Sequence, residues 1–191
     1  MAKAEQPVHS FATPDELGAW LDKHAEESDG IWLKLAKKAS GIPSVVYADA
    51  VEIALCHGWI DGQAKRLDDD HYVQRFTPRR ARSKWSKINR QKAERLIAEG
   101  RMRPGGLREV ERAKQDGRWD EAYDSPTTAT VPEDFKRALA AEPAARDFFE
   151  RLGNTKRYSF LYRIEDAKRP ETRAKRIVEY VALLREGKTL T

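Results

Sequence analysis

The chain has 191 residues, enough for one large domain or two small ones, since domains typically hold about 100 to 200 residues. A single cysteine excludes an internal disulfide framework and any zinc site built from several cysteines, and it fits a reducing compartment. The net charge of +5 is the balance of 36 basic and 31 acidic residues, so the total charge indicates no particular partner.

The sequence gives no sign of membrane insertion or export. No segment approaches the roughly 18 consecutive apolar residues that a membrane-spanning helix needs. The stretch Met1–Ser10 also lacks the basic and then apolar pattern of a secretory signal. We therefore expect a cytoplasmic protein.

Helix and strand signals alternate in the first part of the chain. Thr13 is a typical N-cap, Pro14 fits the first helical position, and two carboxylates follow in the first turn, so a helix should begin here. Residues 31–38 predict a mostly buried strand. A second helix is expected from Tyr47 to about His57, ending at Gly58.

A hairpin and two further helices are expected next. An extended segment starts at Trp59, and residues 72–77 alternate apolar and polar side chains with period two. Asp68–Asp70 would form the polar turn between these strands. The two helices should cover residues 86–98 and 106–115.

The remaining chain has a purely helical pattern. Residues 117–132 contain Gly, Ser, Pro and several Thr, which is typical of a linker. Four helices are expected after it, over residues 133–141, 144–152, 158–167 and 171–186. The sequence thus predicts an α+β domain over residues 1–116, in which helices back a small, mainly antiparallel sheet. A helical C-terminal part, 133–191, is expected to follow the linker and to pack on this domain.

The densest group of chemically active residues is Cys56–Gly62, at the junction of a helix and a strand. Cys56 and His57 are helical neighbours about 100° apart, so their side chains diverge and make a poor catalytic pair. A helix C-terminus also disfavours a thiolate. We interpret Cys56 as a small buried residue and His57 as a hydrogen-bonding one, while a small enzyme using Asp61 or Cys56 remains the alternative.

Residues 71–93 form the sharpest charge asymmetry, with eight cations and no acid. These cations are Arg75, Arg79, Arg80, Arg82, Lys84, Lys87, Arg90 and Lys92. Three hypotheses are open: a solvated basic face, a site for a small anionic ligand, or a nucleic-acid surface over residues 75–92. The last is the least favoured of the three, because no helix-turn-helix, zinc-finger or RNA-recognition signature accompanies the cations.

The preferred hypothesis is a pocket between the start of one hairpin strand and the end of the other. Its expected residues are Trp59, Asp61, Arg75, Arg79, Arg80, Trp85 and Asn89. The arginines would hold an anionic group, Asp61 would orient one of these arginines, and the tryptophans would form apolar walls. It is equally expected that an Asp–Arg pair at this place only holds the hairpin together. No catalytic residue, metal or cofactor is predicted, and Asp68–Asp70 is expected to be a solvated turn, since three consecutive residues cannot all face one ion.

Four motifs in order resemble the YdeI/OmpD-associated family, also called bacteriocin-protection proteins. They are Phe11–Pro14 with Trp20-Leu21, Ala54–Gly62, Arg75–Arg80 with Ser83–Ser86 and Asn89, and Ala167–Arg173. The resemblance implies a role in bacterial resistance to antimicrobial peptides or related stress, and a relation to small α+β proteins grouped as YjbR/CyaY-like. It also implies a periplasmic setting, which the expected absence of an export signal does not support, and it carries no mechanism or cofactor. In the family an aromatic residue usually occupies the position of His57, which further disfavours a catalytic histidine.

The resemblance implies a bacteriocin-protection protein, and the candidate pocket predicts that it binds a small anionic ligand without catalysis. The alternatives are a small enzyme and a nucleic-acid-binding protein. No protein partner is indicated.

Overall fold

The structure is a computed structural model that describes residues 6–190. Residues 1–5, the first half of the stretch predicted to lack an export signal, lie outside the described residues, as does residue 191. The chain forms two compact units. The N-terminal unit comprises Met1–Trp85 and Asn89–Ala122, and the C-terminal unit comprises Ser86–Ile88 and Tyr123–Thr191.

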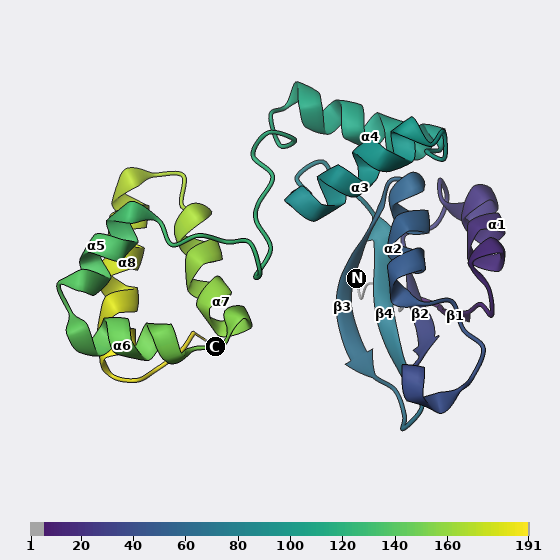
Figure 1. The fold of residues 1–191 in the computed structure, drawn as a ribbon. Helices are drawn as coiled ribbons and strands as arrows, with labels where there is room; N and C mark the ends of the chain where they lie inside the picture. Colours follow the sequence, from purple (N-terminus) through teal and green to yellow (C-terminus); the bar gives the residue numbers. More distant parts are fainter. Residues whose placement is uncertain (1–5, 191) are drawn as a thin grey trace, which may run out of the picture. The chain divides into compact units, whose positions relative to one another are not determined.

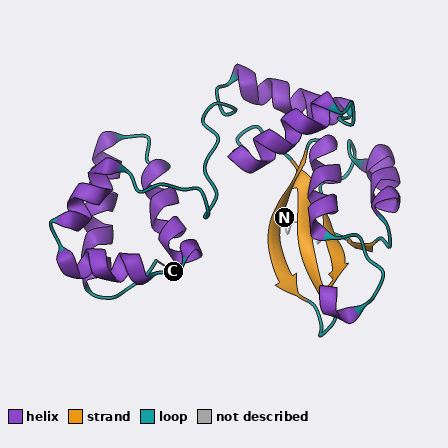
Figure 2. Cartoon of the chain, viewed as in Figure 1, coloured by secondary structure: helices purple, strands orange, loops and turns teal. Residues whose placement is uncertain are grey.

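A four-stranded sheet is the base of the N-terminal unit (Figures 1 and 2). Its strands are β1 (Val8–Ser10), β2 (Ile31–Ala36), β3 (Trp59–Arg66) and β4 (His71–Pro78), in the order β1-β2-β4-β3. β1 runs parallel to β2, and the other pairs are antiparallel. The predicted α+β class with a mainly antiparallel sheet is confirmed, although the sequence did not predict the three-residue β1.

Helices α1 (Pro14–His24) and α2 (Tyr47–Cys56) pack on one face of the sheet (Figure 1). As predicted, the hydroxyl of Thr13 caps α1, accepting from the backbone N–H of Glu16 at 3.3 Å. Along β2, buried side chains alternate with half-buried ones, because successive residues face opposite sides of the sheet. Ile31, Leu33 and Leu35 therefore join the core under the two helices, while Trp32 and Lys34 face away from it.

Helices α3 (Lys87–Ala98) and α4 (Pro104–Gln115) form a second core with the end of α2. Part of the predicted linker 117–132 belongs to this core: Trp119 is 6% exposed, and its ring meets the Trp85 ring edge-on at 4.8 Å. Residues from Tyr123 onward belong to the C-terminal unit. Glycine, serine and proline made the segment resemble a linker, but burial of one large aromatic side chain outweighs that composition.

The C-terminal unit contains four helices, α5 (Glu133–Ala140), α6 (Pro143–Arg151), α7 (Asn154–Glu165) and α8 (Pro170–Arg185). They enclose a core of their own, with Phe135, Phe149 and Phe160 at its centre. Helix α7 begins four residues before the predicted Tyr158, because its first turn is polar and exposed and shows no apolar period. Within residues 6–190, no helix combines the length and the apolar character needed to cross a membrane.

Candidate functional site

The first two residues of the predicted pocket point into the helix-covered side of the sheet. Trp59 is 1% exposed, packs edge-on against Trp20, and donates its indole N–H to the carbonyl oxygen of Ala25 at 3.2 Å. Asp61 accepts a hydrogen bond of 2.7 Å from the hydroxyl of Tyr47, so its partner is a tyrosine and not an arginine. Burial and the neighbouring carboxylate raise the pKa of Tyr47 well above its usual range.

Arg75 lies on the opposite face of the sheet. It pairs across the strands with Trp32, and its Nε donates to Oε1 of Gln6 at 2.7 Å. Asp61 instead lies opposite Phe76, whose ring is in the core under α1 and α2. Because adjacent residues of a strand face opposite sides, strand alternation separates Arg75 from Asp61.

Two of the predicted residues do come together. The guanidinium carbon of Arg79 lies 3.7 Å from the centroid of the Trp85 ring, and its Nη1 donates to the carbonyl oxygen of Lys84 at 3.2 Å. Both side chains are buried, at 5% and 1% exposure, so this cation–π pair belongs to the interior of the unit.

The last two predicted residues lie on the outside of the unit. Arg80 is exposed in the turn after β4, and Asn89 is half-buried near the start of α3. The seven predicted residues therefore do not line one recess. Instead they are divided among the core under α1 and α2, the far face of the sheet, the second core and the surface.

A concave site lies elsewhere in the same unit, between α1, α2 and the loop joining α3 to α4. This groove has a volume of about 710 Å³. It is lined by Pro14, Asp15, Gly18, Ala19, Asp22, Asp49, Glu52, Ile53, Cys56, His57, Gly100, Arg101 and Arg103. On each helix the lining residues recur at intervals of three or four positions, the spacing of a single helical face.

Part of the groove lining is a hydrogen-bonded set around His57. Its Nδ1 lies 2.8 Å from the carbonyl oxygen of Ile53, and its Nε2 lies 3.0 Å from Oδ1 of Asp22. Arg103 reaches the same carboxylate, with its Nε 2.9 Å from Oδ1. The hydrogen bond from His57, with help from Arg103, lowers the pKa of Asp22 below its usual range.

Two further lining residues, Glu52 and Arg101, belong to a network of ion pairs. Glu52 is 2.6 Å from Nη2 of Arg95 and 3.6 Å from Nη1 of Arg101, and Glu99 contacts both arginines at 2.9 and 3.1 Å. Each arginine is therefore shared between two carboxylates. The network fixes Arg101, one of the two arginines that line the groove.

Two further carboxylates give the groove an acidic balance. Among the described residues, Asp15 and Asp49 form no ion pair, although both line the groove. They lie in the first turns of α1 and α2, where negative charge is favoured by the helix dipoles. Four carboxylates and two arginines thus line the groove. The sequence did not predict this site, because its three segments meet only in the folded chain. The one signal available in the sequence was the helical spacing of polar residues on α2.

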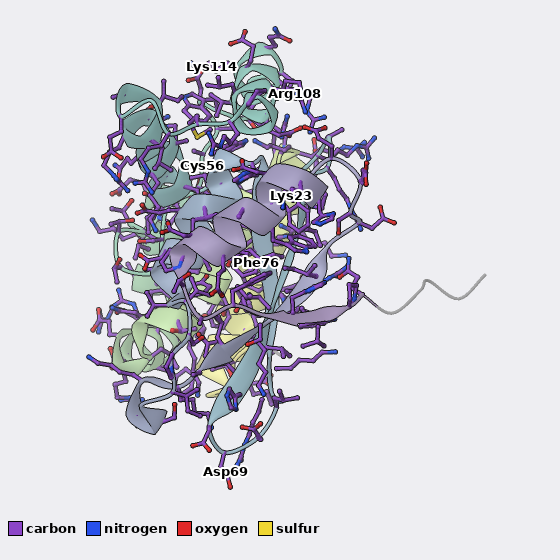
Figure 3. All side chains as sticks on the ribbon, turned by 90° about the vertical axis from the view of Figure 1, so that its right-hand side faces the viewer. Lys23, Cys56, Asp69, Phe76, Arg108 and Lys114 are labelled. Atoms are coloured by element: carbon purple, nitrogen blue, oxygen red, sulfur yellow. The ribbon has the colours of Figure 1, made fainter. Side chains whose placement is uncertain are left out.

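Neither the Cys56 thiol nor the His57 imidazole of the groove is available as a nucleophile or a base. Burial raises the pKa of the Cys56 thiol, so the thiolate is scarce near neutral pH. Both ring nitrogens of His57 are engaged by oxygen acceptors. Within residues 6–190, no three His, Cys, Asp or Glu side chains gather as metal ligands. Away from the groove, Asp69 lies at the exposed tip of the β3–β4 hairpin (Figure 3). In the same turn, Oδ1 of Asp68 accepts from the backbone N–H groups of Asp70 and His71 at 2.8 and 2.6 Å.

These features define a two-unit α+β protein with an acidic groove on its sheet-bearing unit. Residues 9–109, just over half of the chain, match the family described as Domain of unknown function (DUF8412). The chain therefore belongs to this family. Residues 128–187 match the family described as Bacteriocin-protection, YdeI or OmpD-Associated. No curated protein and no solved structure matches the chain significantly.

The two matches divide the four motifs that carried the resemblance. The motif Ala167–Arg173 lies in the bacteriocin-protection match, so the resemblance is supported over the helical unit. The other three motifs lie within the match to DUF8412. The relation to YjbR/CyaY-like proteins finds no support in these matches.

Proposed function

We propose that this protein acts without catalysis in bacterial resistance to antimicrobial peptides, by holding a positively charged segment of such a peptide in the groove between α1 and α2. The cytoplasmic location expected from the sequence is part of this proposal. The observation that carries it is the pair Asp15 and Asp49, two groove carboxylates that form no ion pair with any described residue.

Three lines of support converge on a cationic ligand. The match over residues 128–187 is to a family described by bacteriocin protection. The groove is concave and has more carboxylates than arginines, so its local field attracts positive charge. The ion pairs of Asp22 and Glu52 hold the walls in place before a ligand arrives, which lowers the ordering cost of binding.

The groove supports a binding protein better than an enzyme. The two residues of the enzymatic alternative are Cys56, whose thiol pKa is raised by burial, and Asp61, which accepts a hydrogen bond from Tyr47 outside the groove. The anionic ligand that the sequence favoured would need several free arginines in one recess. In the groove, Arg101 and Arg103 are both already paired with carboxylates.

Titration of a lysine-rich synthetic peptide into the protein at low salt tests the proposal. The double variant Asp15→Asn with Asp49→Asn should bind this peptide roughly 2- to 30-fold more weakly, since each exposed ion pair contributes about 0.2 to 1 kcal/mol. Binding should also fall as salt is raised, because these carboxylates are open to solvent. Survival of cells that express each form during exposure to a cationic antimicrobial peptide gives the matching functional measurement.

A matched control removes the same charge at equivalent helical positions. Glu133 and Glu171 lie in the first turns of α5 and α8, outside the groove. The double variant Glu133→Gln with Glu171→Gln should bind the lysine-rich peptide as tightly as the unmodified protein. Equal weakening by both double variants would reveal attraction to overall charge and would refute a groove-specific role.

A further inference from the structure

The second face of the sheet has a different chemistry from the groove. Helices α1 and α2 cover the face that carries Leu33 and Phe76. The other face carries Trp32, Lys34 and Arg75, which are half-buried, and Lys65, which is exposed. It belongs to the same compact unit as the groove but shares none of its lining residues.

Strand register places the cations of this face around a single indole ring. Trp32 lies directly opposite Arg75, and Lys34 lies opposite Val73, which in turn lies opposite Lys65. Lys65 extends across β4, so that its ammonium nitrogen is 4.5 Å from the centroid of the Trp32 ring. The three cations thus come from three adjacent strands and surround one aromatic platform.

No carboxylate interrupts this arrangement. None of the outward positions that the register defines on the four strands is an aspartate or a glutamate. The nearest acids along the chain lie off this face: Asp29 precedes β2, Asp61 is on the opposite face of β3, and Asp68 in the hairpin turn is already bonded to backbone N–H groups and to His71. Lys34 forms no ion pair with any described residue, and Nε of Arg75 donates to the neutral amide of Gln6.

We propose that this sheet face binds single-stranded nucleic acid, with a base stacked on Trp32 and the backbone phosphates paired with Lys34, Lys65 and Arg75. The ammonium group of Lys65 occupies the ring face in the structure, where a base can replace it as the lysine turns to a phosphate. A sheet face that presents an aromatic ring among cations suits a splayed strand, whose bases are free to stack. Gly62, next to Arg75, carries no side chain and leaves room for the backbone of the strand.

This surface differs from the basic segment 75–92 singled out in the sequence. In that segment Arg79 is buried against Trp85, and Lys87 pairs with Asp124 at 2.8 Å. Only Arg75 is common to both surfaces. The sheet face thus adds two cations and an aromatic ring that the sequence hypothesis did not include.

Fluorescence anisotropy with a labelled single-stranded oligonucleotide of about 10 nucleotides tests the proposal. Three phosphate contacts predict that the logarithm of affinity falls with the logarithm of salt with a slope of about −2. The triple variant Lys34→Gln, Lys65→Gln and Arg75→Gln should remove most of this slope. Trp32→Ala should weaken binding roughly 5- to 150-fold, whereas Trp32→Phe should retain most of it, because a phenyl ring still stacks.

The control triple variant Arg80→Gln, Arg82→Gln and Lys92→Gln removes three cations of the segment 75–92 and should leave affinity and slope unchanged. Circular dichroism of every variant verifies that the fold is intact. Loss of binding in the control but not in the sheet variants would overturn the proposal. It is also overturned if a duplex or a mononucleotide competes as strongly as the single strand, or if the unmodified protein does not bind.

Discussion

Arg173, in the motif Ala167–Arg173, forms hydrogen bonds that link three parts of the C-terminal unit. Its Nε and Nη2 donate to the two oxygens of Asp134 at 2.6 and 3.0 Å, and its Nη1 donates to the carbonyl oxygen of Ile164 at 3.0 Å. These bonds join α8 to the beginning of α5 and the end of α7. The motif Ala167–Arg173, which carried the resemblance in the helical unit, thus includes a residue that links three helices.

Removal of this residue should weaken the helical unit and change its response to acid. The hydrogen bond from Arg173 lowers the pKa of Asp134 below its usual range, so this pair stabilises the fold above about pH 4 and the contribution is lost as pH falls through the lowered pKa. We expect Arg173→Met to cost about 1 to 2 kcal/mol at neutral pH, because both partners are partly exposed. The difference from the unmodified protein should shrink below pH 4.

Urea unfolding followed by circular dichroism between pH 7 and pH 2 measures both effects. Arg146 is the matched control, since its one ion pair with a described residue is to its exposed neighbour Asp147. Arg146→Met should change stability by less than about 0.5 kcal/mol. If the loss in Arg173→Met were independent of pH, the ion pair with Asp134 would not be its cause.

At the residue scale, the sequence could indicate which side chains are chemically unusual but not which of them meet. Arg75 and Arg79 both belong to the same basic segment of the sequence. In the structure Arg75 lies on the sheet face that α1 and α2 do not cover, whereas Arg79 is stacked on the buried indole of Trp85. Their separation depends on strand register and on how the chain turns after Pro78, which local patterns do not encode. The groove was missed for the same reason, since α1, α2 and the 100–103 segment meet only through tertiary packing.

At the element scale, most helices were predictable because their ends carry local signals. Prolines at the first helical position and glycines beyond the last turn depend on backbone geometry alone, as at Pro170 and Gly187 of α8. Helix α4 is different, because it begins with Pro104 followed by two glycines, which are poor helix formers. Its expected start at Gly106 was therefore two residues late.

The glycines of α4 are explained by a close approach to the end of α2. A Cβ atom on Gly106 would lie 2.2 Å from the carbonyl oxygen of Cys56, which also accepts a hydrogen bond of 3.0 Å from the N–H of Arg103. We expect Gly106→Ala to destabilise the N-terminal unit by about 1 to 3 kcal/mol, since backbone must move to admit the methyl group. Urea unfolding monitored by tryptophan fluorescence measures this loss.

Gly18 is the matched control within the same unit. It lies inside α1, and its added Cβ would meet only Ile53 Cγ2, at 4.0 Å. Gly18→Ala should raise stability by about 0.5 to 1 kcal/mol, because alanine loses less backbone entropy in a helix than glycine does. Similar losses in the two variants would show that close contact with Cys56 is not what requires glycine in α4.

At the scale of the whole molecule, each unit has its own closed core. Two clusters of buried side chains lie in the N-terminal unit, and a third, around Phe149 and Phe160, lies in the C-terminal unit. The linker expected from the sequence, 117–132, is divided in the structure, with residues up to Ala122 in the N-terminal unit and those from Tyr123 in the C-terminal unit. Composition indicates where a chain lacks regular structure, whereas the boundary depends on which core buries Trp119.

The five tryptophans provide a direct test of this division, because all of them lie in the N-terminal unit. Tryptophan fluorescence therefore reports unfolding of that unit alone, while circular dichroism also reports the four helices of the other unit. Since the cores are separate, Arg173→Met should lower the midpoint of the circular dichroism transition and leave the fluorescence midpoint unchanged. Gly106→Ala should shift the fluorescence midpoint. If either variant shifted the fluorescence midpoint and the circular dichroism midpoint equally, the two units would unfold in one cooperative transition. That result would contradict the independent stability that their separate cores predict.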